Sequence, residues 1–436
     1  MTYGTPYWWE DGAALPDLSN IPPHKAEVLI IGAGYTGLSA ALTAQRAGAK
    51  VVVVDAALPG QGASTRNGGM AGAHPRLGLA AMSNSFGAEV AVRLFNEAAP
   101  AFAHLRHLLH SAAIDCDFQE TGRIQMAFTR AQFAAQKAMA ADMNAKTAYK
   151  VQVVERGDLG RHIQTDQYFG GLFFADHAAL HPRKFQDGLL AACLREGVQI
   201  IQNCPIWDVT QGGGGFQARW AQGTIAADKI LLATNGYARG NGVFHWIKRR
   251  VFPLPSFIIA TEPLPRDLIA RLAPGRRMMV ETRARHSYFR ISPDGRRILW
   301  GGRAAMTPID PARAARRLHA TMAEVWPELT AVNISHSWRG NTGFTFSNSP
   351  CVGMHAGMHY AFGYCGGGVV LAPYLGMKAA YQMLGDVRGE TAYAETPLQT
   401  RTWHPGGPPL FLKPGEIWYR HMVDRRETAA ARRDHQ

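Results

Sequence analysis

The sequence contains few cysteines, and none at the spacing of a metal site. Five cysteines are spread over 436 residues, and no two of them form a CxxC pair. This spacing is typical of neither a disulfide framework nor a zinc site, so we expect no bound metal. The chain also lacks a run of about 18 apolar residues, and we therefore expect no membrane span. Its first residues lack a basic start followed by an apolar run, which disfavours a signal peptide and favours a cytoplasmic protein.

Acidic side chains are in the minority. The 46 lysines and arginines exceed the 33 aspartates and glutamates, which gives a formal net charge of +13. The densest stretch is 271–303, where nine arginines accompany Glu281 and Asp294. Such arginines most often form a solvated surface, but they also fit a site that attracts a carboxylate. A basic patch interleaved with aromatics is absent, so we do not expect nucleic acid as a partner.

A glycine-rich motif near the start separates two apolar segments. The segment "VLII" is typical of a buried parallel strand, and GxGxxG follows it at Gly32, Gly34 and Gly37. A helix and a second strand, "KVVVVD", come next, and this strand ends at Asp55. Glycines allow the tight turn and the close approach of a pyrophosphate to the helix N-terminus, while the acid binds ribose hydroxyls. The pattern predicts a dinucleotide-binding βαβ unit.

The rest of the chain alternates between helical and strand-like stretches. Residues 81–150 are expected to be largely helical, and the segment from "HPRKFQDGLL" predicts a helix followed by a strand. Asp294-Gly295 predicts a β-hairpin between two apolar strands. A second glycine-rich loop, "GYCGGG", occupies 363–368. The residues beyond 400 resemble a short basic amphipathic extension.

Seven motifs taken together make the sequence similar to a known family. They are "IIGAGYTGLSAA", "ASTRNGG", "LHPRKFQDGL", "ILLATNGY", "YFRISPDGRRILWGGR", "WRGNTGFT" and "GYCGGGV", in this order. The chain resembles the D-amino acid oxidase and sarcosine/glycine oxidase family of FAD enzymes, and within it the γ-glutamylputrescine oxidase-like subgroup. The resemblance implies an α/β fold in which a Rossmann-like FAD-binding domain of the GR2 type is interrupted by an α+β substrate domain with an antiparallel sheet. The expected segments are 20–95, 151–236 and 337–400 for the FAD-binding domain, 96–150 and 237–336 for the substrate domain, and 401–436 for the basic extension.

The resemblance also implies which residues hold the cofactor. The first glycine loop would bind the adenine end of FAD, and the second would bring backbone N–H groups to the flavin ring, where they stabilise the charge of the reduced form near N1. The expected contacts are Gly32, Gly34, Tyr35, Thr36, Gly37, Asp55, Ala56, Ser64, Thr65, Arg66, Asn67, Gly68, Gly69, Met70, Val209, Thr234, Asn235, Gly236, Gly340, Gly363, Tyr364, Cys365, Gly366, Gly367, Gly368 and Val369.

We expect FAD to be held without a covalent bond. Relatives that bond the flavin use a cysteine in the segment that corresponds to 339–345, where this chain has none, or a histidine where Asn67 stands. Cys365 lies in the second glycine loop and is interpreted as a small buried thiol. His74 is the remaining alternative for a covalent anchor.

In this family a hydride leaves the carbon beside an amine, and the imine that forms is hydrolysed. The alternation of a strand places His286, Tyr288 and Arg290 on one face, and Arg303 follows the paired strand. The face beside the flavin could offer an arginine to a carboxylate and a tyrosine or histidine to the amine. Arg303 matches a subgroup position and is our first candidate. The alternative is that Arg290 and Arg303 are structural. No residue is assigned as general base.

The electron acceptor and the reaction itself remain open at this point. Sarcosine oxidase-type relatives carry a lysine above the flavin that assists oxygen, whereas this chain has no lysine between Lys248 and Lys378, and Trp300 falls near the equivalent strand. The enzyme would then pass electrons to oxygen or, as a dehydrogenase, to a carrier. Two other hypotheses are a flavin-dependent RNA-modifying protein and a non-catalytic subunit of a larger oxidase.

Overall fold

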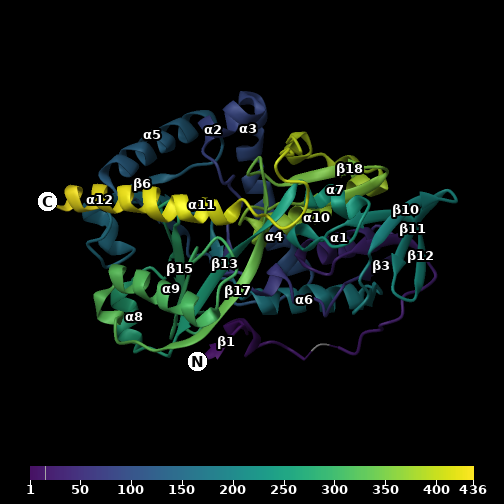
Figure 1. The fold of residues 1–436 in the computed structure, drawn as a ribbon, viewed down its shortest axis with the longest axis horizontal. Helices are drawn as coiled ribbons and strands as arrows, with labels where there is room; N and C mark the ends of the chain where they lie inside the picture. Colours follow the sequence, from purple (N-terminus) through teal and green to yellow (C-terminus); the bar gives the residue numbers. More distant parts are fainter. Residues whose placement is uncertain (15) are drawn as a thin grey trace.

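The computed structural model describes residues 1–14 and 16–436, which form two sheets with helices around them (Figure 1). The first is an eight-stranded sheet. Its central order is β10 (Asp208–Gly212), β11 (Gly215–Trp220), β12 (Gly223–Leu232), β2 (Lys25–Ile31), β3 (Val51–Val54) and β9 (Gln199–Ile201), and the hairpin β18 (Cys351–His355) and β19 (Met358–Phe362) joins it at β12.

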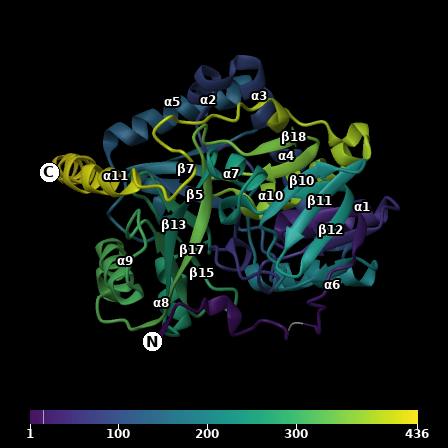
Figure 2. The same cartoon turned by 45° about the vertical axis from the view of Figure 1, so that its right-hand side comes forward.

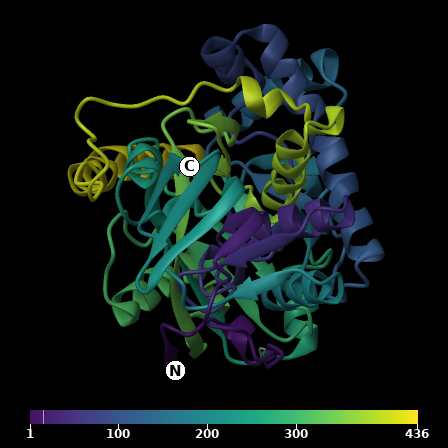
Figure 3. The same cartoon turned by 90° about the vertical axis from the view of Figure 1, so that its right-hand side faces the viewer.

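The inner strands of this sheet are apolar because both of their faces are covered. Four helices pack on one face: α1 (Tyr35–Arg46), α4 (Ala98–Ser111), α6 (Pro182–Arg195) and α10 (Gly368–Leu384). The short helix α7 (Val243–Lys248) packs with the apolar cluster on the other face. β2 pairs in parallel with β3 and with β12, as expected of a βαβ unit. Figure 3 looks onto the side of the molecule that carries this sheet.

The second sheet has nine strands. Their order is β1 (Thr2–Tyr3), β17 (Ile334–Thr345), β13 (Val251–Thr261), β16 (Ile298–Gly302), β15 (Ser287–Ile291), β14 (Met278–Glu281), β5 (Arg123–Met126), β7 (Gly170–Phe174) and β6 (Gln152–Glu155). Pairing is antiparallel except between β1 and β17 and between β5 and β14. The sheet is therefore mixed, whereas the resemblance implied an antiparallel one.

One face of the nine-stranded sheet is covered and the other faces the first unit. Helices α8 (Arg266–Leu272) and α9 (Pro311–Val325) bury the apolar side chains of the covered face. Figure 2 shows β13, β15 and β17 on one side and β10, β11 and β12 on the other. The helices α2 (Leu79–Phe86), α3 (Ala88–Asn96) and α5 (Arg130–Lys146) lie above the junction (Figure 1).

Strand pairing gives its own division of the chain. β6 and β7 fall within the segment 151–236 that was predicted for the FAD-binding domain, yet both belong to the nine-stranded sheet because β7 pairs with β5 and with β6. β17 also crosses the predicted boundary at 336/337. We therefore propose that the second unit extends through β7 and to the end of β17. A small two-stranded sheet pairs β4 (Met70–Ala71) with β8 (Ala178–Ala179) in antiparallel orientation.

The predicted hairpin and C-terminal extension are both present. Between β15 and β16 the N–H of Ser292 donates to the carbonyl of Arg297 at 2.9 Å, and Gly295 has a φ of +74°. The extension forms α11 (Leu412–Trp418) and α12 (Asp424–His435), joined by a π-helical turn, and lies across the nine-stranded unit (yellow in Figure 1). Among the described residues, no helix is both long and apolar enough to cross a membrane.

Candidate active site

The first glycine motif packs its turn and its helix with no room for side chains. Gly32 begins the βα turn, directly after β2, with a φ of +115°, and a Cβ there would lie 2.7 Å from the carbonyl oxygen of Ala233. Gly37 lies in the first turn of α1, where a Cβ would lie 1.8 Å from the carbonyl oxygen of Gly32. Gly34 directly precedes α1, whose first N–H groups have no partner within the helix. This arrangement is a cradle for a phosphate.

Asp55 holds the other side of this turn. Its carboxylate accepts the N–H of Ala33 at 2.7 Å and the N–H of Ala57 at 3.0 Å, and Ala56 beside it is exposed. Burial raises the pKa of the Asp55 carboxyl, while the backbone donors lower it. The acid therefore lies at the end of β3 next to the glycine turn, where the sequence predicted a ribose contact.

Val209 does not lie at the end of β3. It lies in β10 opposite Ala218, and its N–H is taken by the carboxylate of Asp208 at 2.9 Å. The residues that reach the end of β3 are Asn203 and Cys204, whose N–H groups donate to the carbonyls of Ala57 and Asp55. The structure thus favours the segment just before β10, and not Val209, as the neighbour of the adenine end.

The segment after the second parallel strand is held by its own side chains. Ser64 Oγ accepts the N–H of Tyr35 at 3.1 Å, in the first turn of α1. Asn67 donates to the carbonyls of Ala63 and Ser64, and its Oδ1 accepts the N–H of Gly69 at 2.8 Å. Asn67 therefore shapes the turn that presents Gly68 and Met70.

Two predicted cofactor residues of this segment bind the N-terminal residues instead. Arg66 stacks over the ring of Trp9 at 4.6 Å and donates to the carbonyls of Gln61 and Gly4. Thr65 Oγ1 donates to the carbonyl of Gly60 and accepts the indole N–H of Trp9 at 2.9 Å. Their side chains anchor the segment, and only their backbone is left for a ligand.

A cavity of about 550 Å³ separates the two sheets. Predicted cofactor residues and predicted catalytic residues meet in its wall, although they come from segments far apart in the sequence. They are Arg66, Asn67, Gly68, Met70, Gly340, Tyr364, Cys365, Gly366, Gly367 and Val369 for the cofactor, and His286, Tyr288 and Arg303 for the chemistry. The remaining predicted cofactor residues, apart from Val209, lie outside its wall, in turns after strands and in the first turns of helices: Gly32, Gly34, Tyr35, Thr36, Gly37, Asp55, Ala56, Ser64, Thr65, Gly69, Thr234, Asn235, Gly236, Gly363 and Gly368.

The second glycine loop is tied to the first. Thr36 Oγ1 in α1 lies 2.7 Å from the hydroxyl of Tyr364, and Asn235 Oδ1 accepts the N–H of Gly363 at 2.9 Å. Gly366 has a φ of +103° and an open side toward the cavity. The loop ends where α10 begins, so the free N–H groups and the positive dipole end of a 17-residue helix face the cavity.

The two loops therefore fit one extended, negatively charged cofactor. Gly34 and α1 offer N–H groups to a pyrophosphate, and the N-terminus of α10 offers the same to the polar edge of a ring in the cavity. The hydroxyl of Thr234, between the two, is buried without a hydrogen-bond partner in the protein. An orphaned donor of this kind is expected where a ligand completes the site.

Cys365 carries no sign of a reactive thiol. Its side chain is buried, Sγ lies 3.1 Å from the carbonyl oxygen of Gly363, and burial raises the pKa of the thiol. Both ring nitrogens of His74 already have hydrogen-bond partners, because Nδ1 contacts His177 and Nε2 contacts Arg123. These contacts favour the prediction that FAD is held without a covalent bond.

We expect all the flavin to leave the protein on denaturation. Precipitation with trichloroacetic acid should leave the full yellow absorbance in the supernatant, because a protonated, hydrogen-bonded thiol is a poor nucleophile. The Cys365→Ser variant should bind and release flavin to the same extent as the wild type. Yellow colour that stays with the precipitate in the wild type and not in Cys365→Ser would contradict this expectation.

Three of the four predicted catalytic residues line the cavity. Tyr288 lies across Gly68 and Gly301, and its hydroxyl is 2.8 Å from Ser256 Oγ. Burial raises the pKa of Tyr288 to about 12 and lowers the pKa of His286 to about 3, with the positive charges of nearby arginines adding to the latter. Both side chains are therefore neutral at neutral pH.

Arg303 is a charged side chain that has no acidic ion-pair partner among the described residues. Its guanidinium lies over the ring of Phe344 at 5.5 Å, and that of Arg76 lies over the same ring at 5.1 Å. Arg76 also donates to the carbonyl of Cys365 at 3.4 Å. Burial and the neighbouring Arg76 lower the pKa of Arg303 to about 10, so it remains a cation at neutral pH. Among the described residues, acids form ion pairs with the nearby Arg283 and Arg285 but with neither Arg303 nor Arg76.

Arg290 shares the face of Tyr288 but does not reach the cavity. Its guanidinium donates to the carbonyls of Gly69, Leu180 and Ile291 at 2.8–3.0 Å. The catalytic prediction for Arg290 is thus not supported, because its donors already hold the turn at Gly69 from beneath. The structural alternative describes it.

Trp300 lies on the opposite face of its strand. Its ring stacks on Phe289 with centroids 3.9 Å apart, inside the apolar cluster beneath α9. On the other face of β16, Gly301 lies beneath the ring of Tyr288, and Arg303, just after the strand, lines the cavity. Among the described residues, the side chains that line the cavity include arginines but no lysine.

Sequence reasoning missed three cavity arginines, Arg76, Arg123 and Arg283. Arg76 follows the "ASTRNGG" motif by a few residues, so its position in the chain was a weak signal. Arg123 lies in β5, and only the parallel pairing of β5 with β14 brings it to this wall. No pattern local to Arg123 indicates that pairing.

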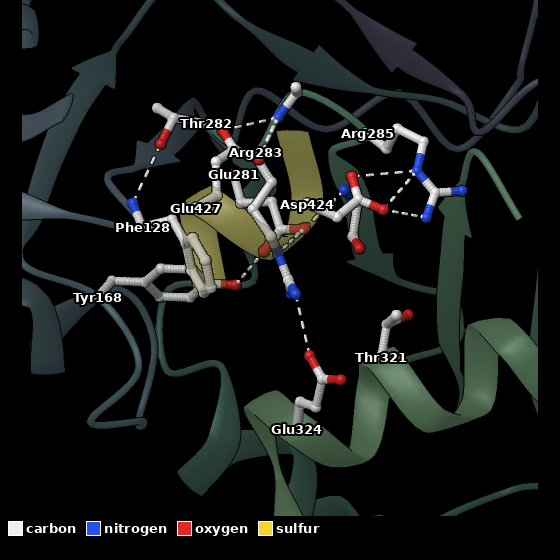
Figure 4. Close-up of polar contacts among 12 residues, drawn as sticks. Phe128, Tyr168, Glu281, Thr282, Arg283, Arg285, Thr321, Glu324, Asp424 and Glu427 are labelled. Carbon is white, nitrogen blue, oxygen red and sulfur yellow. Dashed lines mark hydrogen bonds and ion pairs between the residues drawn. The ribbon is translucent and has the colours of Figure 1, made fainter. Parts of the chain in front are cut away.

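The wall at 281–286 is held from behind by the C-terminal helix (Figure 4). The buried Glu281 accepts the N–H of Ser287 at 2.8 Å and the hydroxyl of Tyr168 at 3.0 Å, and it pairs with Arg283 at 2.9 Å. In α12, Glu427 accepts the N–H of Ala284.

A second ion pair extends this support. Asp424 of α12 pairs with Arg285, and Arg283 pairs with Glu324 of α9 at 2.9 Å (Figure 4). His286 follows directly in the chain. The C-terminal extension therefore contacts the wall at 281–286 and fixes the backbone that carries the cavity residue His286.

Comparison with known proteins agrees with this geometry. Residues 27–382 match the DAO family, described as FAD dependent oxidoreductase. The chain is 30% identical over 375 residues to the probable oxidoreductase OrdL of Haemophilus influenzae, covering 85% of each protein. It is 27% identical to the gamma-glutamylputrescine oxidoreductase of Escherichia coli, covering 90% of this chain and 92% of the relative.

Solved structures support the same fold. The glycine oxidase of Geobacillus kaustophilus superposes with a TM-score of 0.71 at 19% identity, covering 87% of this chain and 99% of that one. The predicted α/β fold with a Rossmann-like FAD-binding unit is thereby confirmed, and so is the predicted FAD. Non-covalent attachment stays a prediction. On the match over residues 27–382, the chain belongs to the DAO family of FAD-dependent oxidoreductases.

Proposed function

We propose that the protein oxidises the C–N bond of an amine or amino acid that carries a carboxylate, with FAD held non-covalently. The observation that carries this proposal is the pair Arg303 and Arg76, two guanidinium groups that line the cavity beside the second glycine loop and lie over the same ring, that of Phe344. The names of similar proteins, a gamma-glutamylputrescine oxidoreductase and a glycine oxidase, support the substrate class. The cytoplasmic location stays a prediction.

The arginine pair calls for an anion. Two cations close to one ring repel each other, and the surrounding protein lowers the pKa of both guanidinium groups by partial desolvation. A carboxylate between them would accept charge-assisted hydrogen bonds from both and relieve the repulsion. The pair would thus orient the acid end of a substrate at one end of the cavity.

The positive charges of Arg303 and Arg76 also favour the neutral form of the substrate amine. Hydride can leave only from the carbon beside a neutral amine, and positive charges nearby lower the pKa of a bound ammonium group. The neutral side chains of His286 and Tyr288 line the space where the amine would lie, and they add no negative charge that would keep it protonated. FAD, when bound, supplies the hydride acceptor, and water hydrolyses the resulting imine. The proton released by the ammonium group passes to solvent.

Anaerobic titration of the purified holoenzyme tests this function. We expect the yellow absorbance to be bleached by at least one amine that carries a carboxylate, from a panel of sarcosine, glycine, proline, γ-glutamylputrescine and iminodiacetate, which carries two. Putrescine, which lacks a carboxylate, should not bleach it. Bleaching would also exclude a non-catalytic subunit. Bleaching by putrescine alone would contradict the role of the arginines, and bleaching by no amine would contradict the proposed function.

The dehydrogenase alternative rests on one observation. The cavity wall contains no lysine among its described residues, so the cation that assists oxygen in sarcosine oxidase-type relatives has no counterpart of the same type. When air is admitted to the bleached enzyme, we expect the yellow colour to return slowly, and an artificial acceptor such as a soluble quinone to restore it faster. Return of the colour within the mixing time would show that Arg303 or Arg76 substitutes for lysine and that the protein is an oxidase.

A further inference from the structure

A second group of donors lines the same cavity, away from the Arg303 and Arg76 pair. It consists of Arg123 in β5, His74 after β4 and His177 before β8. Arg123 lies over the ring of Phe174 at 4.3 Å, and His74 stacks on the same ring with centroids 4.8 Å apart. None of these residues was part of the substrate site described above.

Hydrogen bonds fix the protonation of this group. Arg123 Nη2 donates to His74 Nε2 at 2.8 Å, so His74 carries its proton on Nδ1. That proton is donated to His177 Nε2 at 3.1 Å, and the hydroxyl of Tyr149 reaches the same nitrogen at 3.1 Å. Burial and the charge of Arg123 lower the pKa of both histidines well below the usual value, so both are neutral. Arg123 is the one cation of this group.

Arg123 has donors but no acid. Its Nε atom is buried without a hydrogen-bond partner, and no acid among the described residues acts on its charge. Burial lowers its pKa to about 10, which still leaves a cation at neutral pH. A buried charge without a counter-ion costs free energy unless a ligand supplies one. The two histidines hold the guanidinium in a fixed orientation without neutralising it.

His286 lies between the two groups. Its pKa is lowered by burial and then by the charges of Arg303, Arg76 and Arg123, in that order. In the nine-stranded sheet, β15 and β14 separate β5, which carries Arg123, from β16, which Arg303 follows. The cavity therefore has cationic donors on two sides of the wall that carries His286 and Tyr288.

We propose that Arg123, oriented by His74 and His177, binds a second carboxylate, so that the substrate is an amine that carries two carboxylates. One carboxylate lies between Arg303 and Arg76, the other accepts hydrogen bonds from Arg123, and the C–N bond spans the space beside His286. This inference rests on the proposed function and names its substrate class. The reaction is the same: hydride passes to FAD, and water hydrolyses the imine.

The test uses carboxylates that cannot react. Oxidised holoenzyme is titrated with dicarboxylates from malonate to adipate and with monocarboxylates of the same carbon number, and binding is followed by the change in flavin absorbance. We expect the best dicarboxylate to bind at least about tenfold more tightly than its monocarboxylate, as expected of one further charge-assisted pair. Arg123→Leu should remove this difference and leave monocarboxylate binding unchanged within about twofold.

A matched variant controls for the loss of an arginine from this sheet. Arg277 stacks over Phe173 at 4.7 Å, as Arg123 does over Phe174, but it does not line the cavity. Arg277→Leu should keep the preference for dicarboxylates. Arg123→Lys should restore part of it. If Arg123→Leu binds no flavin, the preference for dicarboxylates over monocarboxylates, measured in the wild type and in Arg123→Lys, still tests the second subsite.

Two outcomes separate this inference from the function on which it rests. Equal binding of dicarboxylates and monocarboxylates by the wild type, or equal weakening of both by Arg123→Leu, would overturn the second subsite and leave the amine oxidation untouched. Failure of every amine to bleach the flavin would overturn the proposed function, whatever the carboxylate preference.

Discussion

Gly37→Ala should yield a protein that contains less than about a tenth of the wild-type flavin, because the Cβ has no space where strand and helix meet. That atom would lie 1.8 Å from the carbonyl oxygen of Gly32 and 3.0 Å from its carbonyl carbon. Both are backbone atoms of the turn itself, so the clash cannot be relieved by a side-chain rotation. α1 must move away from β2, and the N–H groups of its first turn move with it. The measurement is the ratio of flavin to protein absorbance after purification.

Gly157→Ala is the control for this substitution. Gly157 lies in the short 3-10 helix Arg156–Arg161, and a Cβ there meets no atom within 4 Å. This variant should have the flavin content and the melting temperature of the wild type. A yellow Gly37→Ala protein with unchanged flavin content would show that α1 and β2 are less closely packed than the structure indicates.

Arg303→Leu should raise the KM for a carboxylate-bearing substrate by about 100-fold, or about 2.8 kcal/mol at 1.4 kcal/mol per tenfold. Only the charged guanidinium binds a carboxylate, and burial with Arg76 lowers the pKa of Arg303 to about 10. Binding of an unreactive carboxylate to the free enzyme should therefore be constant up to about pH 9 and weaken as the pH rises through 10. In Arg303→Leu this dependence should become shallower, which steady-state kinetics and binding titrations at several pH values will measure.

Arg296→Leu serves as its matched control, since Arg296 is exposed in the turn of the same hairpin. It should leave KM and the pH dependence unchanged. Arg303→Lys keeps a charge but not the planar fork, so it should recover part of the lost affinity. A wild-type KM in Arg303→Leu would assign the carboxylate to Arg76 alone.

The sequence predicted those parts of the site that rest on short-range patterns. The GxGxxG spacing, the apolar strands around it and the Asp294-Gly295 turn each specify a local geometry, and each is present. Alternation along β15 also placed His286 and Tyr288 correctly on the cavity side.

The sequence could not show which atoms of distant segments surround a given side chain. Arg290 and Tyr288 share a face, but the carbonyls of Gly69 and Leu180 lie under Arg290 and bind its donors. Val209 and Trp300 were assigned from their places in strands, whereas the pairing of β10 and the stacking beneath α9 decide their surroundings. Arg123 was missed for the same reason, because its neighbour β14 lies far along the chain.

The order of strands in the two sheets has a consequence for how the chain folds. β2 pairs with β12 through Val28 and Lys229, and β12 pairs with β19 through Leu231 and His359, so neighbours in the sheet are remote in sequence. Each such pairing closes a long loop before any contact energy is gained. A topology of this kind has a high contact order, and it folds slowly because its nucleus must gather distant segments. The flavin cradle, which needs both glycine loops, can therefore form only late in folding.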